Sequence, residues 1–127
     1  MLVDLTGLLM GLVVTAADVQ DRDGARRVLR DARGRWPRLR VVFADGGYAG
    51  RLVGWLRRQC GWVLQTVLRP AGAAGFVPLA KRWVVERTFG WLGKYRRLAK
   101  DYEADVEMSE AMIYAALIHR MVRRLSP

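Results

Sequence analysis

One acidic residue, Glu86, lies among basic and small residues in the stretch Arg-Trp-Val-Val-Glu-Arg-Thr-Phe-Gly-Trp-Leu-Gly, residues 82–93. If residues 82–97 are helical, a rotation of about 100° per residue places four residues within roughly 40° of this acid: Arg82, Gly90, Gly93 and Arg97. Glycines would let a large ligand come close, and arginines suit phosphate. The alternative is a core-packing helix whose acid makes ordinary ion pairs with Arg82 and Arg87.

A second acid, Asp45, ends the β-branched run of residues 39–44 and precedes two glycines. Sheets of α/β proteins place working residues at the carboxyl ends of their strands, although an Asp there can also simply cap a turn. Asp45 and Glu86 could share a divalent cation, because Mg²⁺ prefers hard carboxylate oxygens. Phosphoryl transfer on DNA commonly uses two such ions about 3.5–4 Å apart. These two acids are therefore predicted to hold Mg²⁺, with Mn²⁺ as the alternative.

The bulk composition points to a folded, strongly basic protein. The chain has 127 residues, 52% of them hydrophobic, and a net charge of +10. The positive electrostatic field of such a charge favours nucleic acid or another anionic surface as the partner. The single Cys60 and single His119 exclude a Cys/His zinc cluster and an internal disulfide, which fits a reducing cytoplasm. Residues 1–17 are too short and too interrupted for a membrane span.

The elements that must position the two acids follow from hydrophobic periodicity and turn residues. We expect a hairpin of residues 1–4 and 8–15 joined by a turn at residues 5–7. A helix capped by Asp21 with the apolar stripe Ala25, Val28, Leu29 and Ala32 follows. A strand at 39–44, a helix at 48–60 ended by Gly61, a strand at 62–68 and a loop at 69–80 lead to the Glu86 helix.

The end of the chain is predicted to extend the basic surface. Residues 94–100 hold four bases around one tyrosine and would continue the Glu86 face as a phosphate-tracking surface; the alternative is a solvated helix face. Ser109 is predicted to cap a final helix with a core stripe formed by Tyr114, Leu117, Ile118, Met121, Val122 and Leu125.

Three segments together resemble the catalytic domain of bacterial insertion-sequence DDE transposases, most closely the insertion-sequence-5-like group. They are residues 12–24, residues 44–50 (Ala-Asp-Gly-Gly-Tyr-Ala-Gly) and residues 82–103. The resemblance implies a ribonuclease-H-like mixed sheet with flanking helices, magnesium dependence, and DNA cleavage and joining at transposon ends. It also implies that Asp45 and Glu86 are the second and third catalytic acids. Arg82 matches the family's Tyr-Arg-Glu-Lys signature, whereas Leu79 and Gly93 replace its tyrosine and lysine.

The resemblance further implies that the chain, residues 1–127, is one partial catalytic domain. The first acid of the family stands on a central strand upstream of the hairpin, and this sequence has no such strand. A separate, non-catalytic acid also stands at the hairpin in the family, so the resemblance assigns Asp4 to the turn. We therefore expect either that residues 39–44 pair directly with the hairpin, or that another polypeptide supplies the strand. Loss of one metal ligand of three should make the chain inactive by itself.

Three functional hypotheses remain at this point. The first is a truncated transposase with DNA-binding residues Arg82, Arg87, Lys94, Arg96, Arg97 and Lys100. The second is a basic DNA-binding module whose acids are structural. The third is an inhibitor that pairs through an open sheet edge with full-length transposase, or self-associates. All three place the protein in the bacterial cytoplasm near the nucleoid, without a membrane or a small-molecule cofactor.

Overall fold

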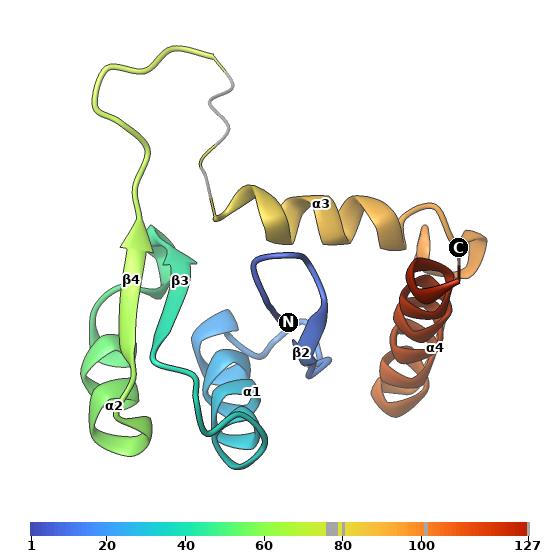
Figure 1. The fold of residues 1–127 in the computed structure, drawn as a ribbon, viewed down its shortest axis with the longest axis horizontal. Coiled ribbons are helices and arrows are strands. Elements are labelled where there is room, and N and C mark those ends of the chain that lie inside the picture. The colour runs from blue at the N-terminus through green and yellow to red at the C-terminus, as the bar shows by residue number, and fades with distance from the viewer. Residues whose placement is uncertain (76–78, 80, 101, 127) are drawn as a thin grey trace.

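The hairpin at the start of the chain is held by its turn. The computed structural model of the protein describes residues 1–75, 79, 81–100 and 102–126, and its elements are drawn in Figure 1. Strands β1 (Leu2–Val3) and β2 (Leu9–Gly11) pair antiparallel. Oδ1 of Asp4 accepts hydrogen bonds from the backbone N–H groups of Thr6 (2.8 Å) and Leu8 (2.9 Å). The expected assignment of Asp4 to the turn is therefore confirmed.

A second, parallel pair of strands carries the principal core. Strands β3 (Val41–Asp45) and β4 (Val63–Val67) pair in register from Val41 opposite Val63 to Asp45 opposite Val67. Helices α1 (Asp21–Arg35) and α2 (Arg51–Cys60) supply the apolar side chains that meet this pair. The buried core members are Leu29, Ala32, Val42, Leu52, Leu56, Trp62 and Leu64. Both strands therefore end at the same edge, and Asp45 is the last residue of β3.

The sequence predicts that α2 ends at Gly61 and that Asp21 caps α1, and only the first prediction is confirmed. Gly61 ends α2 in the left-handed conformation with φ 69°, as expected of a C-terminal glycine. Asp21, however, is the first helical residue of α1, and Gln20 occupies the cap position without a side-chain capping hydrogen bond. The predicted cap at Asp21 is therefore wrong, although an acid in the first turn still interacts favourably with the helix dipole.

The Glu86 helix is shorter than expected. Helix α3 spans Trp83–Leu92, and the chain then turns through Gly93 into the 3-10 helix η2 (Arg96–Leu98). Nε of Arg97 pairs with Oε1 of Glu103 at 2.7 Å, and the expected continuation of the Glu86 face to Arg97 is therefore wrong. Glycine is a poor helix former, and the two glycines near the helix end allow this early stop.

The final helix, α4 (Val106–Leu125), packs on α3 through a small second core of Leu92, Ala116 and Leu117. Its cap is Asp105, which accepts from the backbone N–H of Glu107, and not Ser109 as expected. The predicted core stripe is also only partly buried. Leu117 is enclosed, whereas three members of that stripe are at least half exposed: Ile118, Val122 and Leu125.

The mixed α/β class is confirmed, but the described strands form two separate pairs. The hairpin pairs only with itself and β3 only with β4, so the expected pairing of residues 39–44 with the hairpin is wrong. Figure 1 shows the hairpin lying beneath α3, with β3 and β4 on one side and α4 on the other. The inner edges of β1 and β3 therefore have no strand partner within the described part of the chain.

Candidate active site

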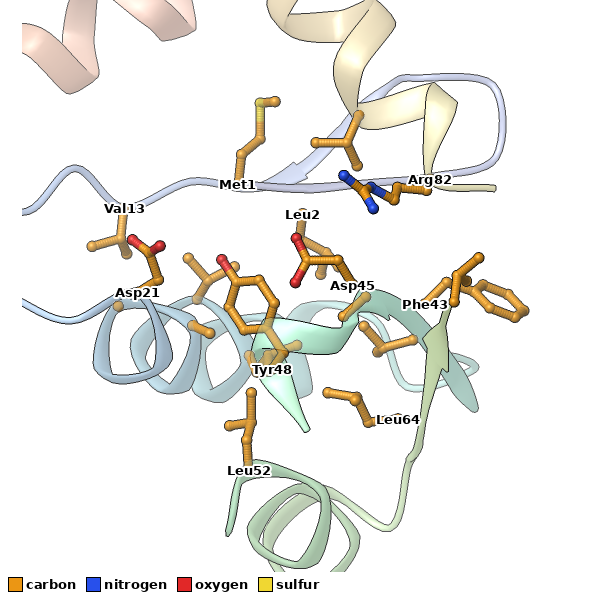
Figure 2. Close-up of a pocket in the computed structure, with 18 of the residues that line it drawn as sticks. Met1, Leu2, Val13, Asp21, Phe43, Asp45, Tyr48, Leu52, Leu64 and Arg82 are labelled. Atoms are coloured by element: carbon orange, nitrogen blue, oxygen red, sulfur yellow. The ribbon is translucent and has the colours of Figure 1, made fainter. Parts of the chain in front are cut away.

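A cavity of about 380 Å³ lies between the hairpin, α1, β3 and α3. Figure 2 shows its lining side chains converging from these elements. Asp45 and Glu86 both line this cavity, although they come from parts of the sequence far apart. Apolar side chains also line the cavity, among them Leu2, Val42 and Leu64. The two acids predicted from the sequence are thus brought to one hollow.

Asp45 is fixed by the turn that follows β3. Its Oδ1 accepts a hydrogen bond of 2.8 Å from the backbone N–H of Gly47, at the start of the short helix η1 (Gly46–Tyr48). A Cβ added at Gly47 would stand only 3.0 Å from that oxygen, so the glycine permits the close turn. The capping hypothesis and the ligand hypothesis are compatible here, because the carboxylate has a second oxygen with lone pairs of its own.

Glu86 is oriented by Arg82, one helical turn before it. Nε of Arg82 lies 3.4 Å from Oε1 of Glu86, and the side chains are 42% and 46% exposed. An ion pair this exposed is easily exchanged for other partners, because solvent screens it. Gly90, a turn after the acid, is exposed and has no atom within 4 Å of its Cβ position. The acid therefore borders open space, as the glycines predicted.

Three further side chains of the cavity were not selected from the sequence. Burial, Asp21 and Asp45 together raise the pKa of the Tyr48 hydroxyl, and Figure 2 shows the Tyr48 ring between these two acids. A tyrosine hydroxyl is protonated at neutral pH even without such a shift, so Tyr48 can donate a hydrogen bond there. Nζ of Lys81 lies 4.1 Å from the centre of the Phe43 ring, and Lys81 has a φ of 73°, which is uncommon for a residue with a side chain. No spacing rule in the sequence marks these residues.

The two acids are the kind of ligand that a divalent cation prefers, but two protein ligands alone are too few to hold the ion. Asp45 and Glu86 offer the hard oxygens that Mg²⁺ prefers. Within the described residues, however, no group of three acids, histidines or cysteines stands close enough to hold one ion. Asp21 lines the same cavity without completing such a group. A metal held here would therefore need a further ligand besides these two.

The remaining basic residues expected to bind DNA occupy different places. Nη2 of Arg87 donates to the carbonyl of Thr6 at 2.9 Å, and its guanidinium lies between Trp83 and Trp91. Lys94 and Lys100 are exposed on either side of η2. Arg96 and Arg97 border a second hollow against α4. Of the six predicted residues, only Arg82 lines the cavity that holds both acids.

Comparison with known proteins decides the family. The sequence profile of the transposase DDE domain matches residues 1–121, which is nearly the whole chain. The chain belongs to the transposase DDE domain family. No curated protein and no solved structure showed a significant match.

Family membership gives the DDE domain described here a role in DNA transposition, and it implies DNA as the partner. Enzymes of this family generally use divalent metal ions. No helix in the described part of the DDE domain has both the length and the apolar character required to cross a bilayer.

Proposed function

We propose that this chain is part of a DDE transposase that cuts and joins DNA at insertion-sequence ends, with Asp45 and Glu86 as two of its metal-holding acids. The observation that carries the proposal is the shared cavity: an acid at the end of β3 and an acid on α3 line one hollow. Within this family we propose the insertion-sequence-5-like group, on the basis of residues 12–24, 44–50 and 82–103.

Several residues in or beside the cavity have a defined task in this proposal. A bound Mg²⁺ or Mn²⁺ would supply Lewis-acid activation of the attacking and leaving oxygens. Arg82 exchanges its exposed pair with Glu86 for a DNA phosphate, because guanidinium groups bind phosphate in a two-pronged geometry. Gly90 lets the DNA backbone approach the acid. The hydroxyl of Tyr48, which also lines the cavity, can donate a hydrogen bond into the same hollow.

We further propose that an additional acid-bearing strand completes the site between β1 and β3. Three observations support this step: the two strand pairs are separate, a cavity lined in part by apolar side chains lies between them, and the described residues bring no third ligand to the two acids. A strand inserted there would also satisfy unpaired backbone groups, which cost about 1–3 kcal/mol each when buried dry. Without that strand the chain should bind DNA but not cut it.

The test is strand cleavage and strand transfer on a labelled transposon-end duplex with Mg²⁺ or Mn²⁺. The chain is compared with a version extended upstream by one Asp-bearing strand, and with that version carrying D45N or E86Q. We expect activity only in the extended protein with both acids intact. Full activity of the extended protein after either substitution would contradict the proposal.

The second candidate is a basic DNA-binding module or an inhibitor that pairs with intact transposase, without catalysis. The open inner edges of β1 and β3 favour it, because an exposed edge can accept a strand from another chain. Co-purification with full-length transposase, unaffected by D45N and E86Q, together with inactivity of the extended version, would favour this candidate. Both candidates place the protein beside the bacterial chromosome in the cytoplasm.

A further inference from the structure

Three arginines meet at one tryptophan on a part of the surface separate from the two acids. The guanidinium carbons of Arg120, Arg87 and Arg124 lie 3.5, 4.8 and 5.6 Å from the centre of the Trp91 ring. Arg87 also lies 4.9 Å from the ring of Trp83, which is 44% exposed. We name these five side chains the Trp91 cluster. It joins α3 to the last turns of α4.

The positive charge of this cluster is not balanced within the protein. Among the described residues, the ion pairs involve Arg26, Arg82 and Arg97, and no carboxylate pairs with an arginine of the Trp91 cluster. Nε of Arg87 and Nε of Arg120 are buried and have no hydrogen-bond partner. Attraction to an aromatic face offsets only part of the repulsion between like charges held this close. An external anion would relieve that repulsion.

The hairpin turn holds the central arginine of the Trp91 cluster, Arg87, in place. Arg87 donates to the carbonyl of Thr6, and the adjacent Gly7 approaches α3 closely. A Cβ at Gly7 would stand 3.0 Å from the Trp91 ring. Arg87 and the Trp91 ring are thus fixed by the hairpin, while Arg120 and the exposed Arg124 keep donors for a ligand.

The Trp91 cluster and the cavity lie on different sides of α3. Trp83, Arg87 and Trp91 follow one another at intervals of four residues and share one side of α3. Arg87 is one residue after Glu86, so this side is turned by about 100° from the acid. The cluster and the cavity therefore border different faces of the same helix.

We propose that the Trp91 cluster is a second DNA-backbone site, which holds a segment of duplex beside the cavity rather than in it. Planar guanidiniums match phosphate oxygens, and their stacking on Trp91 fixes their orientation before binding. The proposal takes DNA as the partner from the family, and it does not depend on Asp45 and Glu86 holding a metal.

The test measures the salt dependence of duplex binding by the full chain, by fluorescence anisotropy without divalent metal. R120Q/R124Q should reduce the slope of log K against log salt by about two, since each phosphate contact contributes about 0.9. The matched control is R27Q/R123Q, which removes the same charge from two exposed arginines outside the cluster. Equal slopes for the two variants would overturn the proposal.

A second measurement uses the unmodified protein and does not depend on how the variants fold. Duplex DNA should protect Arg120 and Arg124 from an arginine-directed dicarbonyl reagent, as mapped by mass spectrometry, and should leave Arg123 reactive. Equal modification of Arg120 and Arg124 with and without DNA would overturn the site. Both measurements are made without divalent metal, whereas the proposed catalytic site is tested by metal-dependent strand cleavage, so failure of that site and failure of this one are distinguishable.

Discussion

Nε of Arg82 lies 3.4 Å from Oε1 of Glu86 on the wall of a cavity that Asp45 also lines. The pair places the arginine that we propose binds phosphate and the acid that we propose binds metal one helical turn apart. Because both side chains are about half exposed, their attraction to each other is weak and open to competition by a ligand. In our proposal this pair lies where DNA phosphate and a divalent metal ion would bind.

Replacement of Arg82 by glutamine should change binding more than stability. The exposed pair with Glu86 contributes only about 0.3–0.5 kcal/mol, so the free energy of unfolding should change by less than about 0.5 kcal/mol. Affinity for duplex DNA should fall several-fold, as measured by anisotropy. R27Q, an exposed arginine on α1, serves as the control and should leave affinity closer to wild type. A loss in R27Q equal to that in R82Q would remove the special role of Arg82.

Gly90 should be required for ligand approach and not for folding. Space is open at its Cβ position on α3, so G90A should raise the free energy of unfolding by up to about 1 kcal/mol through helix propensity. G34A near the end of α1 meets equally open space and should be neutral or stabilising. DNA affinity should fall only in G90A. Unchanged affinity in both variants would show that this glycine does not admit the DNA backbone.

Gly7 should tolerate no side chain. Its φ of 87° is unfavourable for other residues, and a Cβ would stand 3.0 Å from Trp91 and 3.2 Å from Thr88. G7A should therefore lower the free energy of unfolding by about 1–3 kcal/mol, measured by urea denaturation. G50A shares the positive φ but has open space, so the difference between the two variants isolates the contact with α3. Equal losses would assign the whole effect to backbone conformation.

The turn carboxylate of Asp4 should make stability dependent on acid. Burial acts to raise the pKa of Asp4, but hydrogen bonds from Leu8 and Thr6 outweigh it and hold the pKa below its ordinary value. Because the pKa of Asp4 is lower in the folded protein than in the unfolded chain, where it is near 4, the ionised carboxylate stabilises the fold at pH values above about 4. This contribution is lost as the pH falls through the pKa of the folded protein. The thermal midpoint of D4N should therefore lie below wild type near neutral pH and converge with it in acid. A constant difference down to about pH 2 would contradict this assignment.

Local signals in the sequence predicted the local structure well. A β-branched run followed by two glycines placed Asp45 at the end of β3, and Gly61 ended α2 in the left-handed conformation as expected. The apolar stripe of α1 is buried at Val28, Leu29 and Ala32. These features depend on periodicity and backbone preference over a few residues, which the sequence contains directly.

Features that depend on long-range packing were not predictable. An apolar stripe on α4 indicates that a partner surface is favourable but does not say whether the chain provides one, and Ile118 remains 54% exposed. Tyr48 follows β3 in the sequence, but Asp21 reaches it from α1 only because the fold brings α1 and the end of β3 together. The Trp91 cluster likewise combines residues from α3 and α4. No spacing along the sequence encodes such encounters.

The most direct test of the account is Mn²⁺ binding, followed by electron paramagnetic resonance. It compares the protein extended upstream by one Asp-bearing strand, which serves as the wild type here, with its D45N/E86Q variant. The matched control is D31N/E107Q, which makes the same charge change at two exposed acids that do not line the cavity. We predict that D45N/E86Q weakens Mn²⁺ binding at least tenfold, because both proposed protein ligands are removed, while the control binds as wild type does. Equal Mn²⁺ affinity in the wild type and in D45N/E86Q would contradict the assignment of Asp45 and Glu86 as metal ligands.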